Sequence, residues 1–370
     1  MKISCDREQL LQAFQTAAAV APARSPKPIL QNVKLEATRE GTTLTATDLE
    51  VGIRHAVQGV EVHAPGAIVL SVTRFGSILR ESADETLQIE SEGGNTTIRG
   101  QRSQFSLPAE NPGDFPPVAE FTAEAYFEIP ARLLRELIRR TAFATDNESS
   151  RYALGGVKLE ATDGVLTAIG TDGRRLAKMS GPVGVHGGAD MGPTTIVPTR
   201  AMNLIERAVA PSDAEVQLAV RGNEFLVKSA RATISARLLE GRFPDWRRVF
   251  PELGSGHRIE LSVGPTHAAV RQAAIVTSEE SRGVDFAFGD GMLVLSGRAA
   301  EVGESRVELP IGYDGAPIVT TLDPKFAIDF LKVLDAEKTF TLEMKDSDAA
   351  AVCTTDDGYG YVIMPLARDR

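Results

Sequence analysis

Hydrophobic and polar residues alternate over several short stretches of this chain. Val33, Leu35 and Ala37 occupy every second position, and Leu44 and Ala46 continue the alternation after a polar turn. Successive side chains of a strand point to opposite faces of its sheet, so this period predicts strands with one buried face. The chain should therefore contain antiparallel sheets that are covered on one side.

Other segments show the apolar spacing of amphipathic helices, and each is followed by alternating strands. The plan of helix, strands, helix, strands occurs three times along the chain. It predicts an α+β fold in which two helices pack on antiparallel sheets in each copy. The expected helix cores are residues 7–20, 74–83, 131–143, 200–209, 264–276 and 325–334.

The sequence itself repeats with the same plan. "LQNVKLEATREGTTLTATDLEVGIRH" begins at Leu30, "LGGVKLEATDGVLTAIGTDGRRLAK" at Leu154, and a weaker copy, "RGVDFAFGDGMLVLSGRAAEVGES", at Arg282. A period of about 125 residues has the size of a domain and excludes a solenoid. We expect three tandem domains at residues 1–120, 121–250 and 251–370, joined by turn-rich linkers at 110–121 and 240–254.

The distribution of charge changes the first impression of an acidic protein. The chain has 40 basic and 50 acidic residues and a formal net charge of -10, which at face value argues against a nucleic-acid partner. The six helix cores, however, hold 12 basic and five acidic residues. An ordinary solvated face explains one such helix, but a bias shared by six indicates a polyanion held through its backbone phosphates, independently of sequence.

The cellular setting is constrained by what the sequence lacks. The N-terminus has no apolar signal segment, and no stretch approaches 18 consecutive apolar residues. Cys5 and Cys353 are the only cysteines, too few for a disulfide framework or a Cys-rich zinc site. We expect a cytoplasmic protein that uses no membrane, no metal and no cofactor.

One short stretch, Thr171 to Arg175, has the residue types of a catalytic loop, a phosphate site or a turn. The first repeat places Asp48 where the second has Asp172, but Leu49 and Glu50 where the second has Gly173 and Arg174. The shared Thr-Asp pair is best explained by the fold, with the aspartate bonding its own backbone. The unshared Gly-Arg-Arg-Leu is then where one repeat acquired a function.

An enzyme and a scaffold that binds only proteins are the alternatives to a nucleic-acid-binding protein. An enzyme is disfavoured because the chain has no phosphate-binding loop, dinucleotide fingerprint, zinc-protease motif or nucleophile elbow, and its five histidines do not cluster at ligand spacing. A scaffold that binds only proteins would explain the repeats but not the basic helices.

Several motifs together resemble one family, the bacterial DNA polymerase III β subunits, or sliding clamps. The resemblance covers all 370 residues in order. It implies three tandem clamp domains, a head-to-tail homodimeric ring with helices inside and sheets outside, and a non-catalytic role in tethering DNA polymerase to duplex DNA. The motifs are "RSPKPIL" from Arg24, "QFSLP" around Phe105, "DFP" at Asp114, "RYALGGV" from Arg151, "TDGRRLA" from Thr171, "EGRFPDWRRVFP" from Glu240 and "YVIMPL" near the C-terminus.

The resemblance implies a partner cleft between the second and third domains. The cleft would accept short peptides from the DNA polymerase III catalytic subunit, the clamp loader, other polymerases, and mismatch-repair or ligase proteins. The alternative for Val362, Ile363 and Met364 is a buried last strand. The cleft positions are Leu154, Thr171, Gly173, Arg174, Arg175, Leu176, Pro244, Arg248, Val249, Phe326, Val362, Ile363, Met364, Pro365 and Leu366.

Two further sets of residues complete the expectations. The family points to Arg24 and the inner helices for duplex DNA, and the charge pattern adds Arg80, Arg132, Arg135, Arg139, Arg140 and Arg200. Phe105 and Leu107, with Ile275 and Val276 on the other side, match the family's ring interface, although ordinary core positions would look the same. Ala153 and Ser281 depart from the family, whose members often have an aromatic residue at these places.

Overall fold

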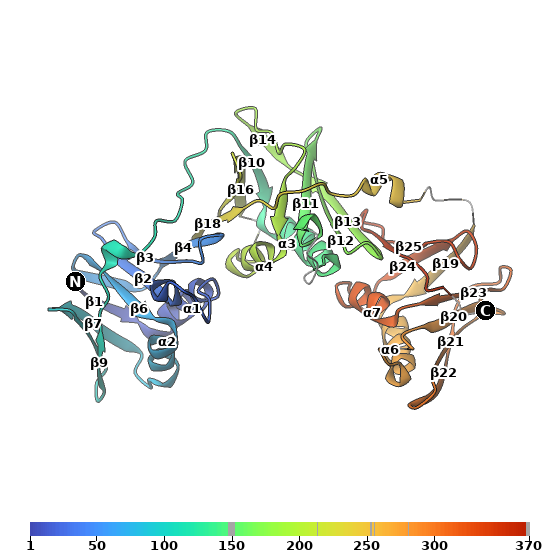
Figure 1. Ribbon diagram of the computed structural model, residues 1–370, viewed down its shortest axis with the longest axis horizontal. Coiled ribbons are helices and arrows are strands. Elements are labelled where there is room, and N and C mark those ends of the chain that lie inside the picture. The colour runs from blue at the N-terminus through green and yellow to red at the C-terminus, as the bar shows by residue number, and fades with distance from the viewer. Residues whose placement is uncertain (147–151, 213, 252–253, 255, 280, 368–370) are drawn as a thin grey trace. The chain divides into compact units, whose positions relative to one another are not determined.

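The computed structural model describes residues 1–146, 152–212, 214–251, 254, 256–279 and 281–367 (Figure 1). The chain divides into two compact units. Unit 1 comprises residues 1–135 and 183–238, and unit 2 comprises residues 136–182 and 239–370. This division runs through the second repeat, whose strands join sheets with both neighbouring repeats. The domain boundaries expected near residues 120 and 250 stay a prediction.

All six predicted helix segments are helical. Asp6 and Asp323 cap α1 and α7 by accepting hydrogen bonds from the backbone N–H groups of Gln9 and Lys325. The third and fifth predicted helices were too long, because their last residues form separate 3₁₀ turns that tighten the helix ends. The helices are α1 (Arg7–Ala18), α2 (Val72–Glu81), α3 (Ala131–Thr141), α4 (Thr199–Ala208), α6 (Val263–Ala273) and α7 (Pro324–Lys332), and a short helix α5 (Trp246–Val249) lies in the second predicted linker.

A strand precedes the first helix of each repeat, and the predicted plan lacked it. These strands are β1 (Lys2–Asp6), β10 (Tyr126–Pro130) and β19 (His257–Ser262). Each pairs antiparallel with the strand that follows the second helix of its own repeat: β7 (Thr86–Glu92), β16 (Glu215–Arg221) and β24 (Thr339–Met344). Strands of five or six residues hold only two or three buried positions, too few to stand out by alternation alone.

Unit 1 contains a sheet that crosses from the second repeat into the first. Its order is β14-β10-β16-β17-β18-β4-β3-β2-β6, and a second sheet has the order β5-β1-β7-β8-β9. The crossing pair is β18 with β4, in register from Ala232 opposite His55 to Ala236 opposite Val51. The remaining strands of these sheets are β2 (Asn32–Ala37), β3 (Thr42–Thr47), β4 (Val51–Val57), β5 (Val60–Ala64), β6 (Gly66–Ser71), β8 (Asn95–Arg99), β9 (Gln104–Pro108), β14 (Gly184–His186), β17 (Glu224–Lys228) and β18 (Ala232–Arg237). A short strand outside these two sheets, β15 (Ile196–Pro198), leads into α4.

Unit 2 has a corresponding sheet that crosses from the second repeat into the third. The order β11-β12-β13-β26-β25-β24-β19 contains the crossing pair β13 with β26, from Arg175 opposite Ile363 to Lys178 opposite Gly360. Another sheet has the order β22-β21-β20-β23. These strands are β11 (Gly156–Thr162), β12 (Val165–Thr171), β13 (Arg175–Pro182), β20 (Val284–Gly289), β21 (Met292–Ala299), β22 (Gly303–Pro310), β23 (Ile318–Leu322), β25 (Ala351–Thr354) and β26 (Gly360–Ile363).

The two crossings define two comparable regions. We call the surroundings of the β4–β18 pair the first junction, which lies within unit 1, and those of the β13–β26 pair the second junction, which lies within unit 2. In both, the last strand of one repeat pairs with the third strand after the first helix of the preceding repeat. No helix among the described residues is long and apolar enough to cross a membrane.

Candidate functional site

The stretch Thr171–Arg175 is a tight turn between β12 and β13. The Asp172 carboxylate accepts hydrogen bonds from the backbone N–H groups of Arg174 and Arg175 at 2.9 and 3.0 Å. The Thr171 hydroxyl donates to the Arg175 carbonyl at 2.6 Å and accepts from Gly173 N–H at 3.1 Å. Gly173 has φ +88°, a left-handed conformation that glycine adopts without strain.

The first repeat builds the same turn with different residues. The Asp48 carboxylate accepts from the backbone N–H groups of Glu50 and Val51, and the Thr47 hydroxyl donates to the Val51 carbonyl and accepts from Leu49 N–H. Leu49 takes the left-handed conformation at φ 78°. The interpretation of the Thr-Asp pair as a structural turn agrees with this geometry, and it gives Asp172 no acid–base role.

Arg175 ties the turn of the second junction to its surroundings. The side chain is 7% exposed and donates from Nε to Asp172 at 3.0 Å and from Nη1 to Asp329 of α7 at 2.7 Å. Its Nη2 donates to the carbonyl of Phe143 at 2.9 Å, and its guanidinium lies 4.5 Å from the ring centroid of Phe326. A buried guanidinium that is bonded through all three of its nitrogens holds the turn, α7 and the end of α3 together.

The fifteen cleft positions separate into a supporting layer and a surface. The buried ones are Leu154, Thr171, Arg175, Leu176, Phe326, Val362 and Ile363, so two of the three residues that could have been a buried last strand are indeed core residues of β26. Pro365 and Leu366 are half-buried, and the residues open to solvent are Gly173, Arg174, Pro244, Arg248, Val249 and Met364.

The structure brings most of this surface together. Met364 N–H donates to the Arg174 carbonyl at 2.9 Å, which places the exposed Met364 side by side with the turn. The Arg174 guanidinium lies 5.6 Å from the ring centroid of Phe326. The space in front of Gly173 is open, because a Cβ added there would meet no described atom within 4 Å.

The short helix α5 presents two more of the exposed positions, Arg248 and Val249. Its Trp246 indole donates to Glu160 of β11 at 3.4 Å, and the Lys178 ammonium of β13 lies 5.5 Å from the indole centroid and 5.4 Å from that of Phe250. Hydrogen bonds from Lys158 and Arg247 hold the pKa of Glu160 below its ordinary value, although burial opposes them. This anchoring leaves Arg248 and Val249 exposed.

The arginines of α3 do not share one environment. At about 100° per residue, Arg139 lies within about 20° of Arg132, whereas Arg135 and Arg140 lie about 60° and 80° to either side. Arg132 and Arg139 are exposed. Arg135 on one flank donates to the Val209 carbonyl at 2.8 Å.

Arg140, on the other flank of α3, donates to Asp357 at 2.6 Å and is only 11% exposed. Arg200 is also engaged, with Asp48 and with the Val20 carbonyl, the latter at 2.7 Å. Arg24 and Arg80 are exposed, and Arg80 donates to the Ser77 hydroxyl of its own helix. The basic arc read from the sequence is therefore a narrower exposed stripe with structural arginines at its edges.

The residues expected to contact DNA did not include the exposed cations of the third repeat. Arg271 of α6 and Lys332 of α7 are exposed. Burial lowers the pKa of His267, and the charges of Arg271 and Lys332 lower it further. Repeat spacing could have found Lys332, because it lies 125 positions after Arg207, which itself lies 127 positions after Arg80.

The expected ring-interface residues lie beside two sheet edges. Phe105 and Leu107 are on β9, at the end of the sheet β5-β1-β7-β8-β9. Ile275 and Val276 form the turn after α6, next to β22 at the end of the four-stranded sheet β22-β21-β20-β23. Phe105 is 38% exposed and Ile275 is 76% exposed, so neither is an ordinary core residue within one chain.

Neither a metal-binding cluster nor an activated thiol occurs in the part of the chain that the structure describes. No group of three or more His, Cys, Asp or Glu side chains could hold a metal ion there. Burial raises the pKa of both Cys5 and Cys353 to about 12, so neither thiol forms a thiolate near neutral pH.

Three family models cover nearly the whole chain in order. They describe the DNA polymerase III beta subunit: its N-terminal domain matches residues 1–119, its central domain residues 128–245 and its C-terminal domain residues 247–367. The chain belongs to the DNA polymerase III beta subunit family. The expectations of a three-domain α+β clamp fold and of a non-catalytic processivity factor, a beta sliding clamp, are thereby confirmed.

Individual relatives agree with the family models. The beta sliding clamp of Chlamydia pneumoniae is 30% identical over 367 residues, covering 99% of each chain. A crystal structure of the DNA polymerase III subunit beta from Pseudomonas aeruginosa superimposes with a TM-score of 0.87 at 28% identity, covering 100% of both chains. The sliding clamp of the same organism bound to griselimycin gives a TM-score of 0.89 at 28% identity, again covering both chains fully. Membership in this family carries DNA and a DNA polymerase as partners.

Proposed function

We propose that two copies of this chain close head to tail into a ring around duplex DNA, and that partner proteins dock short peptides on the second junction. The ring would slide without sequence preference and hold the DNA polymerase III catalytic subunit on its template. A ring on the chromosome acts in the cytoplasm, at the nucleoid.

The observation that carries the ring is a strand pairing that occurs twice within the chain. The last strand of the second repeat, β18, pairs with β4, and the last strand of the third, β26, pairs with β13. The last strand of the first repeat, β9, and the corresponding third strand of the third repeat, β22, both end their sheets.

These two edges are the complementary halves of a third junction. Sheet edges with unpaired backbone groups favour pairing with another strand. A contact between two different surfaces of identical chains closes into a ring when the rotation allows it. The exposed Phe105 and Ile275 beside these edges provide apolar area for the contact.

The exposed helix cations supply the DNA-facing surface of this proposal. Arg24, Arg80, Arg132 and Arg139 are all exposed, and Arg271 and Lys332 extend the set to the third repeat. Contacts of this kind go to phosphates and carry no sequence information. The engaged side chains of Arg135, Arg140 and Arg200 contribute positive potential but not direct contacts.

The docking surface combines exposed apolar groups with a turn that a partner backbone can approach. Met364, Val249, Pro365 and Leu366 supply apolar area, and methionine adapts to differently shaped partners. Gly173 leaves its backbone open. We propose that the clamp loader, other polymerases, and mismatch-repair and ligase proteins bind here through extended peptides.

Retention on DNA tests the ring. The protein is loaded onto nicked circular and linear duplexes and washed with high salt, which weakens phosphate contacts steeply. We expect retention on the circle and loss from the linear DNA, because topology rather than affinity holds the ring. Equal loss from both substrates would contradict encirclement.

Oligomeric state tests the edges that would close the ring. Phe105→Asp and Ile275→Asp each place a charge at a proposed apolar contact, so light scattering should show monomers at concentrations where the parent chain is dimeric. Val185→Asp on β14 is the matched control, since Val185 is equally an exposed apolar residue on a strand. A dimer that survives both edge substitutions would refute this interface.

Peptide binding tests the docking surface. Met364→Asp should weaken a clamp-binding peptide by about tenfold or more, because a desolvated apolar contact is replaced by a charge. Deleting residues 364–370 should abolish binding while the dimer stays intact. Val165→Asp, another exposed apolar position of unit 2, serves as control. Unchanged affinity in the deletion would remove the C-terminal segment from the site.

A further inference from the structure

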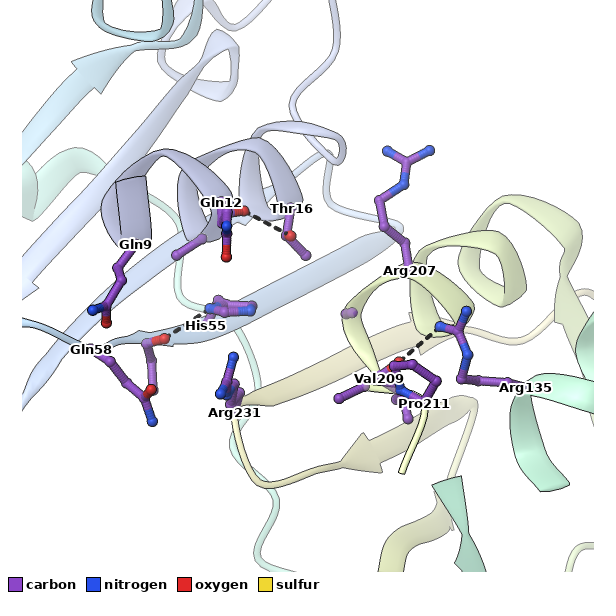
Figure 2. Close-up of a pocket in the computed structure, with 14 residues that line it drawn as sticks. Gln9, Gln12, Thr16, His55, Gln58, Arg135, Arg207, Val209, Pro211 and Arg231 are labelled. Carbon is purple, nitrogen blue, oxygen red and sulfur yellow. Dashed lines mark hydrogen bonds between the residues drawn. The ribbon is translucent and has the colours of Figure 1, made fainter. Parts of the chain in front are cut away.

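A polar cavity of about 420 Å³ lies at one end of the first junction (Figure 2). Figure 2 shows Gln9, Gln12 and Thr16 along α1 on one side and Val209, Pro211 and Arg135 on the other. Arg231, in the turn between β17 and β18, lies between these walls with His55 of β4 beside it. All of these residues belong to unit 1.

The cavity is lined by cations without carboxylates. Arg135, Arg207 and Arg231 line it, whereas no aspartate or glutamate does. Among the described residues, neither Arg207 nor Arg231 has a salt bridge, and both are exposed at its rim. Arg135 is held at the C-terminal end of α4 by the carbonyls of Glu206 and Val209.

The other polar groups are neutral hydrogen-bonding groups. Gln9, Gln12 and Gln58 contribute side-chain amides, whose N–H groups can donate to an anion. The His55 ring bonds through Nδ1 to the Ala56 carbonyl at 2.9 Å. Burial lowers the pKa of His55, and the nearby charge of Arg231 lowers it further, so the ring is neutral near pH 7.

The corresponding place at the second junction is filled. There Arg140 of α3 donates to Asp357 at 2.6 Å, contacts the sulfur of Met179 at 3.5 Å and lies 5.1 Å from the ring centroid of Tyr359. Asp357 sits in the turn between β25 and β26, the counterpart of the turn that holds Arg231.

The first junction therefore lacks both halves of that ion pair. Thr16 occupies the position of α1 that corresponds to Arg140 of α3, 124 residues later, and leaves the space open. Arg231 replaces an acidic turn residue by a basic one. A cation remains at the edge of a hollow whose opposite wall offers no counter-charge.

We propose that this cavity binds a small oligophosphate. Guanidinium groups match phosphate oxygens with paired, charge-assisted hydrogen bonds, and the glutamine amides can satisfy the remaining oxygens. The lining has no Phe, Tyr or Trp side chain on which a nucleobase could stack, and His55 is buried, so the recognised part is the phosphate chain. The bound anion takes the role that Asp357 has at the second junction.

Calorimetric titration of the full-length protein with sodium tripolyphosphate at about 0.15 M salt tests the site, since this salt screens non-specific attraction between exposed charges. We expect saturable one-to-one binding per chain, and a loss of affinity of about tenfold or more for Arg231→Ala. Arg237→Ala is the matched control, because Arg237 is an exposed arginine at the far end of β18 and is paired with Glu50. No saturable binding, or equal binding by both variants, overturns the proposal.

A second variant separates loss of the site from loss of the fold. Thr16→Arg combined with Arg231→Asp transplants the ion pair of the second junction, and it should abolish tripolyphosphate binding while thermal stability is kept. Binding that persists in this variant overturns the proposal. Anisotropy with a short duplex distinguishes the source of the phosphate: Arg231→Ala should leave DNA affinity unchanged. If it weakens DNA while tripolyphosphate does not bind, the cavity belongs to the DNA-facing surface and the proposal fails.

Discussion

The first and second junctions share the same strand pairing and the same turn, but their central guanidinium comes from different repeats. At the first junction it belongs to the later of the two repeats, and at the second to the earlier one. At the first, Arg200 of α4 reaches back to Asp48 and to the Val20 carbonyl. At the second, Arg175 of β13 bonds Asp172 and the Phe143 carbonyl and reaches forward to Asp329. At both junctions a cation lies between the turn, the end of the first helix and the next repeat.

The origin of the guanidinium goes together with a difference in the residues that each turn exposes. With Arg175 buried beneath the second turn, the neighbouring Gly173 and Arg174 stay exposed beside Met364. At the first turn, Leu49 and Glu50 take these places, and Leu49 fills the approach that Gly173 leaves open. In our proposal, the exposed turn of the second junction serves as a docking surface for partner peptides, whereas the corresponding turn of the first junction has no such role.

The largest expected difference in stability between the two junctions follows from removing each guanidinium. Arg175→Ala leaves two carboxylates without their partner in a mostly buried setting, which should destabilise unit 2 by about 3–5 kcal/mol. Arg200→Ala removes a side chain that is 54% exposed and should cost about 1 kcal/mol or less. Amide hydrogen exchange of β26 and of β4 in the two variants measures each effect locally.

Equal losses of hydrogen-exchange protection at the two junctions would show that both cations contribute equally to stability despite their different burial. Arg247→Ala is a control for the second junction, because Arg247 is a well-exposed arginine of unit 2 whose salt bridge to Glu160 lies at the surface. It should leave the protection of β26 unchanged.

Exchanging the residues in the left-handed turn position should change the stability of the two junctions in opposite directions. Gly173→Leu places a side chain at φ +88° and should cost about 1 kcal/mol, whereas Leu49→Gly should recover part of a similar strain. Thermal unfolding of the two variants checks the opposite signs. If Leu49→Gly destabilises instead, packing of the half-exposed Leu49 outweighs its backbone strain.

Acid titration should show the smallest effect, confined to the second junction. Burial alone would raise the pKa of Asp357, but hydrogen bonds from Thr355 and Arg140 and the charge of Arg140 hold it below its ordinary value of 3.8. A carboxyl with a lower pKa in the folded state stabilises above about 3.8 and loses this contribution as the pH falls.

The melting temperature of Asp357→Asn should therefore lie below that of the parent chain at pH 6, and the gap should narrow towards pH 3. Thr16→Ala at the first junction removes no charge, so its difference from the parent should stay constant over this range. A gap for Asp357→Asn that does not change with pH would indicate that the carboxylate charge contributes nothing to stability.

Several features could be predicted because they are local. The similar stretches that begin at Leu30, Leu154 and Arg282 indicated three copies, and apolar periodicity predicted all six long helices. The Thr-Asp turns followed from the tendency of aspartate to bond its own backbone. Periodicity and turn chemistry depend on neighbours in sequence, so one chain without its structure is enough to show them.

Other features could not be predicted, since they depend on which surfaces meet. Nothing near Arg140 or Arg200 in sequence shows that Asp357 and Asp48 will engage them, so both appeared to be free cations. The backbone of Leu49 follows its glycine counterpart only because the same turn is imposed on it.

The repeat, the fold class and the family follow from the amino-acid sequence alone, because they reside in periods and motifs along the chain. Only the tertiary structure decided that sheets continue from one repeat into the next, and that Val362 and Ile363 are core while Met364 is surface. It also decided that one junction is filled by an ion pair and the other is hollow. These outcomes depend on contacts between residues more than 100 positions apart, where packing and charge pairing rather than local pattern select the partner.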